Sequence, residues 1–273
     1  MEFTTSQLAL LGATLLGAGV VAGVLAGLLG VGGGIVIVPV LYHGFGALGV
    51  EPAVRTHVAV ATSLATVVVT AWRSARSHHA RGAVDTELLR RWAPAVAAGA
   101  VLGTGVAARL EGAALAGIFG VVALGVALHM AFGRERWRLA AAPPRGPARH
   151  VVGGAIGLVS VMMGLGGGTL GVPTLTLLGV PIHRAIGTAA GLGLVIATPG
   201  AIGLALAGLD APGRPPGCLG YVNGIGFALI VPATWLAAPL GARWAHASSR
   251  SALRRAFALF LGLTAVRMLA DLV

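Results

Sequence analysis

The sequence predicts an all-α polytopic membrane protein made of two inverted-topology repeats, each with a glycine-broken or re-entrant helix and about three further membrane helices. The first observation is composition: of 273 residues, 56% are hydrophobic and 10% are charged, whereas about 25% of a soluble domain is charged. The second is a set of glycine-centred motifs that occurs in both halves of the chain. The third is the placement of arginine in short loops between apolar runs.

The apolar segments supply the membrane-crossing elements. Two of them are too long for one simple crossing, because a helix of 34 residues would measure about 51 Å and the hydrocarbon core is about 30 Å thick. Glycine clusters, Gly30–Gly34 and Gly164–Gly168, interrupt these two segments, so we expect a helix, an unwound turn and a second partial helix in each. Pro39 and Pro173 favour a short or bent second helix. The segments cover residues 8–41, 58–72, 88–108, 113–132, 151–180, 185–209, 222–242 and 253–272.

Three ordered blocks of similar sequence indicate an internal duplication. The Gly30–Gly34 cluster recurs as Gly164–Gly168, followed at the same distance by proline. The block that ends in Thr62 is repeated in the block that ends in Thr188, and Gly82-Ala83-Val84-Asp85 corresponds to Gly220-Tyr221-Val222-Asn223. We therefore divide the chain into a first repeat, residues 1–133, a Pro- and Arg-rich linker, 134–150, and a second repeat, 151–273.

The distribution of arginine predicts that the two repeats are inverted. The net charge is +11, but the basic residues gather in the loops 73–91, 134–149 and 243–255. This is the positive-inside pattern and argues against a nucleic-acid-binding face. The basic loop follows the second apolar segment of the first repeat but the third segment of the second repeat, so equivalent loops face opposite sides. Each repeat must then cross an odd number of times, with both termini outside and the linker in the cytoplasm.

The glycine turns are the first candidate binding elements. A turn that leads into a helix leaves amide N–H groups at a positive helix end, which favours an oxyanion. We expect the two turns to meet near the midplane and to hold one anion between them. The alternative is that these glycines only allow close contact between helices. The residues concerned are Gly32, Gly33, Gly34, Gly166, Gly167 and Gly168.

Hydroxyl and imidazole groups near the start of two helices are the second set of candidates. Thr62, Ser63 and Thr188 could complete the anion site, and ordinary hydrogen bonding between helices is the alternative. His57 and His183 occupy equivalent positions and could assist proton movement or hold an anion; a capping or interface role is the alternative.

Two further residues are predicted to cap helices, and no motif indicates catalysis. Asp85 and Asn223 stand where N-caps are expected. The chain has one cysteine, Cys218, and lacks metalloprotease, nucleotide-binding and hydrolase motifs. We therefore predict no catalytic residue, no metal site and no cofactor.

Several of these motifs together resemble the sulfite exporter TauE/SafE family of membrane permeases. They are Gly-Leu-Leu-Gly-Val-Gly-Gly-Gly-Ile-Val-Ile-Val-Pro-Val-Leu at 27–41, Ala-Val-Ala-Thr-Ser-Leu at 59–64, the second-half echoes through Pro173 and Thr188, and Leu-Gly-Tyr-Val-Asn at 219–223. The resemblance implies a multi-pass permease of the bacterial inner membrane that moves sulfite, organosulfonates or related sulfur-containing anions. The departures are Ala189 after Thr188 and Thr169 after the second glycine run, and they bear on the symmetry of the site.

On this basis we expect export by alternating access, in which the inverted repeats rock about the bound anion. The rival hypotheses are an anion channel, an uptake permease for sulfur compounds, and a non-transporting membrane scaffold. The expected partners are a small anionic substrate and the lipid bilayer, without nucleic acid, and the candidate oligomer is a homodimer.

Overall fold

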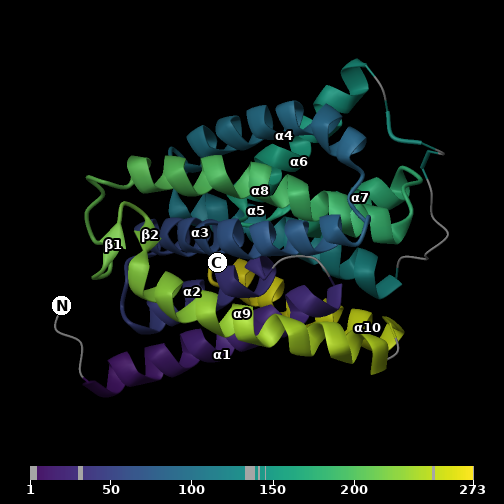
Figure 1. Ribbon diagram of the computed structural model, residues 1–273. Coiled ribbons are helices and arrows are strands. Elements are labelled where there is room, and N and C mark those ends of the chain that lie inside the picture. The colour runs from purple at the N-terminus through teal and green to yellow at the C-terminus, as the bar shows by residue number, and fades with distance from the viewer. Residues whose placement is uncertain are drawn as a thin grey trace.

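The structure is a computed structural model, and it describes residues 5–29, 33–132, 139–140, 142–144, 146–247 and 250–272. Over these residues the chain is all-α apart from one short hairpin (Figure 1). The elements are α1 (Thr5–Leu29), α2 (Gly34–Ala47), α3 (Pro52–Ala80), α4 (Thr86–Ala107), α5 (Gly112–Phe132), α6 (Pro147–Met162), α7 (Gly167–Leu177), α8 (Ile182–Ala207), β1 (Cys218–Leu219), β2 (Val222–Asn223), α9 (Gly224–Ala247) and α10 (Arg250–Ala270).

Both long apolar segments are broken at their glycine clusters, as predicted. In the first, α1 ends at Leu29 and α2 begins at Gly34; Gly30 and Gly32 lie outside the described residues. In the second, α6 ends at Met162 and α7 begins at Gly167, and the turn between them contains Gly164 at a φ of 68°. Such a positive φ suits glycine, which has no Cβ. The helices that follow are short, 14 residues for α2 and 11 for α7.

The helices lie in three layers (Figure 1). In that view α4 and α6 form the upper layer, α3, α5, α7 and α8 the middle, and α1, α2, α9 and α10 the lower. Helices α3 and α8 pack against each other at the centre of the molecule. Three described helices, α3, α5 and α8, are long and apolar enough to cross a membrane.

Helices from the two predicted repeats pack against one another in pairs, among them α3 with α8 and α5 with α10. Helix α9 of the second repeat packs along α1 of the first, and α4 of the first packs along α6 of the second. Small residues permit both contacts, as is common between membrane helices. A Cβ at Gly23 would lie 2.6 Å from the carbonyl oxygen of Thr234, and a Cβ at Gly99 would lie 2.0 Å from that of Gly154.

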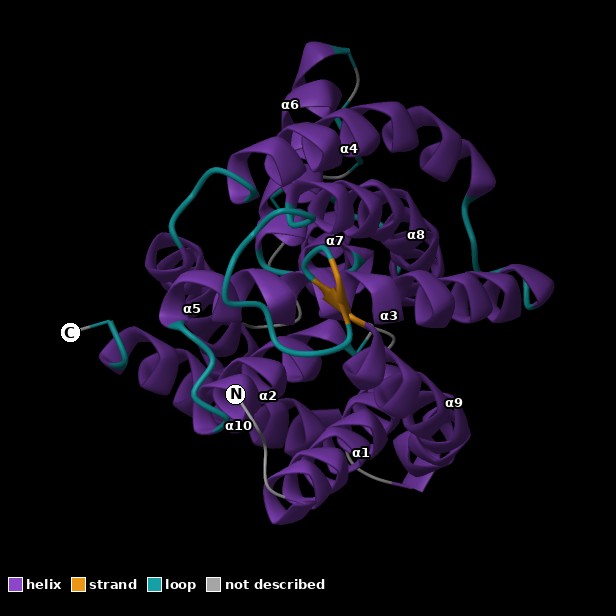
Figure 2. Cartoon of the chain, turned by 90° about the vertical axis from the view of Figure 1, so that its left-hand side faces the viewer, coloured by secondary structure: helices purple, strands orange, loops and turns teal. Residues whose placement is uncertain are grey.

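A two-stranded hairpin closes one end of the helix layers. Strand β1 pairs antiparallel with β2, and Gly220 stands in the tight connection at a φ of 56°. Figure 2, which looks at this end, shows the hairpin in the middle of it. The sequence predicts only a loop here, because strands of two residues are too short for a readable alternation.

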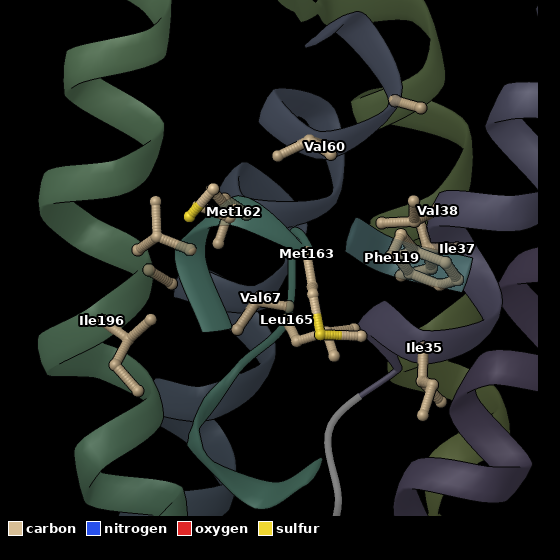
Figure 3. Packing of buried hydrophobic residues seen from close by; sticks show 14 of the residues in the cluster. Ile35, Ile37, Val38, Val60, Val67, Phe119, Met162, Met163, Leu165 and Ile196 are labelled. Atoms are coloured by element: carbon tan, nitrogen blue, oxygen red, sulfur yellow. The ribbon is translucent and has the colours of Figure 1, made fainter. Parts of the chain in front are cut away.

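The buried core lies where the α6–α7 turn meets α2 and α3. Met163 and Leu165 of the turn are fully buried. Figure 3 shows them in the centre of the view, with Ile196 of α8 on one side and Ile35 and Ile37 of α2 on the other. The second glycine turn is therefore inside the molecule.

Candidate functional site

The start of α2 and the α6–α7 turn meet at Ser63 of α3. The Ser63 hydroxyl donates a hydrogen bond of 2.7 Å to the carbonyl oxygen of Gly164. A Cβ at Gly34 would lie 2.8 Å from the same oxygen and 3.2 Å from the Ser63 hydroxyl. Gly33 is the N-cap residue of α2 and is also buried, beside Ala22 of α1. The start of α2, the middle of α3 and the α6–α7 turn thus share one buried contact.

The second turn also packs against α8. A Cβ at Gly167 would lie 2.4 Å from the carbonyl oxygen of Ala189 and 2.5 Å from the amide nitrogen of Gly193. A Cβ at Gly166 would lie 2.9 Å from the side chain of Val67 and 3.9 Å from the Cα of Gly193. Gly168 is buried in the first turn of α7. Close backbone packing therefore accounts for Gly167 directly, whereas the space at Gly166 is limited by a side chain. The predicted site residue Gly32 lies outside the described residues.

Thr62 takes part in a contact that we name the α9 junction, made of Thr62 and Asn223. The Asn223 amide donates to the Thr62 hydroxyl oxygen at 2.8 Å. The Asn223 side chain caps α9 by accepting from the Gly226 amide at 2.7 Å, and it donates to Pro216 and to the Cys218 sulfur at 3.0 and 3.3 Å. Both Thr62 and Asn223 are buried. Burial raises the pKa of the Cys218 thiol, which lies in the hairpin outside the long helices.

Thr188 makes the corresponding contact at the other end of the helix layers, which we name the α4 junction. The Asp85 amide donates to the Thr188 hydroxyl oxygen at 3.0 Å. The Asp85 carboxylate caps α4 by accepting from the Leu88 amide at 3.0 Å. It also faces Arg184 of α8, with 3.8 Å between the nearest nitrogen and oxygen atoms.

The residues of the two junctions correspond in the sequence repeat. Thr62 matches Thr188, and Asn223 matches Asp85, so each threonine receives the cap amide of the opposite repeat. The N-cap prediction is confirmed for Asp85 and Asn223. For the two threonines, these bonds are the interhelical role that the sequence left as the alternative.

The two predicted histidines differ in environment. His57 is buried, lies within 3.1 Å of the Ala53 carbonyl oxygen and 3.0 Å of that of Ala107, and stacks on Tyr221 at 4.9 Å. His183 is exposed in the first turn of α8. His57 lies five residues into α3, against the end of α4 and Tyr221, whereas His183 is the second residue of α8.

Two buried hydroxyls near the second turn were missed by sequence reasoning as site candidates. The Ser160 and Thr169 side-chain oxygens are buried and have no hydrogen-bond partner. Thr169 follows the second glycine run directly, and that departure from the first run is the signal that could have identified it. The surroundings are otherwise apolar, so the polar character of this region comes from hydroxyls and backbone groups.

Nothing in the described part of the chain gathers a metal-binding set. No group of three His, Cys, Asp or Glu side chains lies close enough there to hold an ion. The arrangement offers hydrogen-bond donors and helix N-termini, which bind anions without a metal.

Comparison with known proteins indicates that this chain is similar to membrane transporters. The profile described as Sulfite exporter TauE/SafE matches residues 15–268. A probable membrane transporter protein of Haemophilus influenzae is 32% identical over 251 residues, which cover 92% of this chain and 95% of the relative. A probable membrane transporter protein of Methanocaldococcus jannaschii is 25% identical over 229 residues, which cover 81% and 79%. No solved structure matches this chain. The protein thus belongs to the sulfite exporter TauE/SafE family of multi-pass membrane transporters.

Proposed function

We propose that the protein exports small sulfur-containing anions, such as sulfite or organosulfonates, across the bacterial inner membrane by alternating access. Membership in the sulfite exporter family supports the substrate class. The observation that carries the mechanism is the pair of equivalent junctions, because each joins the cap of one repeat to a helix of the other. Two such contacts at opposite ends of the molecule allow one end to open while the other stays closed.

The sidedness of the proposal follows from the arginine loops. The α3–α4 connection, the linker and the α9–α10 connection carry the arginines, so we assign the α4 junction to the cytoplasmic face. The hairpin end, with the α9 junction, then faces outward (Figure 1). Helix pairs α1–α2 and α6–α7 act as re-entrant elements that approach the midplane from opposite sides, which supplies the odd number of crossings that inversion requires.

The two glycine turns with Ser63 form the proposed central site. Gly34 lies against the Gly164 carbonyl, so the start of α2 is closed against the second turn in this structure. An anion reaches the amide groups of Gly33, Gly34 and Gly166–Gly168 only when the turns separate. Rocking of the repeats about α3 and α8 supplies that separation, and Thr62 and Thr188 regulate it from the two ends.

The membrane potential is sufficient to drive export. An inside-negative potential favours the exit of an anion by about 2.3 kcal/mol per charge per 100 mV. A monoanion therefore needs no coupling ion at moderate gradients. Uptake would require coupling to protons or sodium, for which the membrane-spanning sequence offers no carboxylate pair.

Flux of labelled sulfite into inverted vesicles that contain the purified protein tests the proposal. We expect saturable flux driven by a potential of the matching sign. Unsaturable flux would instead indicate a channel, and movement only in the opposite sense with a proton gradient would indicate an uptake permease. Silent vesicles would indicate a scaffold.

Ser63→Ala tests the central site within the same assay. The substitution removes the hydroxyl that holds the Gly164 carbonyl, so we expect sulfite flux to fall while the protein stays folded. Thr70→Ala is the matched control, because the Thr70 hydroxyl bonds only within its own helix, to Thr66 and Val67. Equal flux in the two variants would exclude Ser63 from the site.

A further inference from the structure

A second polar site lies beside the α4 junction. Helix α4, the linker and the α7–α8 connection enclose a cleft of about 280 Å³. A cleft of that volume admits a small hydrated solute. Arg91, Arg149 and Arg184 line it, with the carboxylates of Asp85 and Glu87.

The three arginines differ in how well they are paired. Arg91 pairs with Glu87 on its own helix. An Nη atom of Arg184 lies 3.8 Å from a carboxylate oxygen of Asp85, and the Arg184 side chain is 61% exposed, so this ion pair is long and accessible to solvent. The Arg149 Nε atom is buried without a hydrogen-bond partner, and an Nη atom contacts His150 at 3.2 Å. The described lining residues carry three positive and two negative charges, so the cleft has a net charge of +1. The Arg149 Nε–H group is free to donate a hydrogen bond to a ligand.

We propose that this cleft binds the oxyanion substrate from the cytoplasm and that the bound anion replaces Asp85 as the ion-pair partner of Arg184. This inference deepens the proposed function and rests on it. A small oxyanion offers several acceptor oxygens to guanidinium groups, which bind such ligands in bidentate geometry. The present Arg184–Asp85 contact is too long for such a bond, so exchange of partner favours the anion.

Release of Asp85 couples capture to opening of the α4 junction. The same residue receives Arg184 through its side chain and donates to Thr188 through its backbone. Loss of the ion pair removes one of the polar links between α8 and the start of α4, and the bond from the Asp85 amide to Thr188 remains. Substrate on the cytoplasmic side thereby weakens the closed cytoplasmic end, which is the order of events that an exporter requires.

The equivalent position at the α9 junction lacks this charge pair. In the repeat, Val58 stands where Arg184 stands, and Asn223 where Asp85 stands. The hairpin end therefore has no counterpart of the exchange, which agrees with capture at one face only.

Two substitutions with opposite expected effects test the inference. The full-length protein in detergent is titrated with sulfite, and binding is followed as a rise of the thermal midpoint. Arg184→Gln should raise the half-saturating concentration about tenfold, because a charge-assisted contact is lost. Asp85→Asn should lower it about threefold, because the cap oxygen stays while the competing charge disappears. Arg90→Gln, an exposed arginine of α4 outside the cleft, is the matched control and should leave it unchanged.

The outcomes separate this inference from the proposed function. If wild-type vesicles carry sulfite but Arg184→Gln and Asp85→Asn both leave half-saturation unchanged, the capture site is wrong and the transporter proposal stands. If Asp85→Asn weakens binding as Arg184→Gln does, the pair is a structural ion pair and not a competitor of the anion. If wild-type vesicles carry no sulfite, the proposed function itself fails.

Discussion

The α9 and α4 junctions make the same hydrogen bond in different surroundings. At each, a threonine hydroxyl accepts the amide of a helix-capping residue from the other repeat. The α9 junction is buried and neutral, and its Asn223 side chain uses both ends of its amide. The α4 junction is half-exposed and charged, with Arg184 against Asp85. The backbone geometry of the contact is thus alike at the two junctions while the side chains differ, and our proposal assigns the tight closure to the α9 junction and the ligand-sensitive one to the α4 junction.

Backbone packing of the two helix pairs differs in the opposite sense: α4 against α6 is tighter than α1 against α9. Helices α4 and α6 approach so closely that a Cβ at Gly99 would lie 2.0 Å from a carbonyl oxygen. Helices α1 and α9 are less tightly packed: a Cβ at Gly23 would lie 2.6 Å from the Thr234 carbonyl oxygen, and one at Gly19 would lie 2.7 Å from the Ala233 methyl and 3.0 Å from the Ile230 carbonyl. The contact between α4 and α6 therefore has less room to adjust.

The largest expected effect follows from this packing difference. Gly99→Ala must move the α4 or α6 backbone, so we expect it to cost about 3 kcal/mol or to prevent assembly, whereas Gly19→Ala should cost about 1 kcal/mol. Yield of monodisperse protein and its thermal midpoint measure both. Gly17→Ala is the control on α1, because nothing lies within 4 Å of its Cβ. Equal losses at Gly99 and Gly19 would show that the two contacts are equally tight.

The next largest effect on stability is expected when each cap residue is replaced by its counterpart, Asn223→Asp or Asp85→Asn. The two substitutions should differ in cost. Asn223→Asp places a buried carboxylate oxygen against the Pro216 carbonyl, where an amide now donates, so it should cost about 3 kcal/mol. Asp85→Asn keeps the cap oxygen and loses only an exposed ion pair, so it should cost below about 1 kcal/mol. Thermal unfolding of both variants checks this, and the reverse order would contradict the burial difference.

Removal of the threonine hydroxyls gives a smaller contrast. Thr62→Val leaves the buried Asn223 amide without an acceptor and should cost about 2 kcal/mol. The bond from the Asp85 amide to Thr188 is only partly buried, so Thr188→Val should cost less, about 1 kcal/mol. Serine at either position keeps the hydroxyl acceptor, so Thr62→Ser and Thr188→Ser should retain most of the stability that the valine variants lose. If serine restores nothing, the methyl groups and not the hydroxyls hold the junctions.

The smallest expected effect is a change of rate at Cys218. Its sulfur accepts from the Asn223 side chain, so loosening of the α9 junction in Thr62→Val should speed alkylation by a maleimide, and Thr188→Val should not. Because burial raises the pKa of this thiol, less thiolate is present at a given pH than for an ordinary cysteine. The rate should climb about tenfold per pH unit and continue to climb past the usual thiol range. A plateau at the ordinary thiol pKa would show that the site is open to water.

Local features of the chain were readable without the fold. The glycine clusters end α1 and α6 and allow the turns, Pro39 and Pro173 accompany short helices, and Asp85 and Asn223 cap α4 and α9. Each of these outcomes depends on backbone chemistry within a few residues: the freedom of glycine, the missing amide hydrogen of proline, and the short acceptor side chain of Asp or Asn. For the same reason the all-α class and the broken segments were predictable.

Contacts between distant residues were decided only by the tertiary structure. Ser63 and Thr62 are neighbours in sequence, yet one bonds to Gly164 and the other to Asn223, because adjacent residues point about 100° apart around a helix and meet different partners. The pairing of α4 with α6 and of α9 with α1 is equally invisible in the sequence, since a small-residue face fits more than one neighbouring helix. Periodicity fixes which face of a helix is buried, and only the packing of all the helices together selects what that face touches.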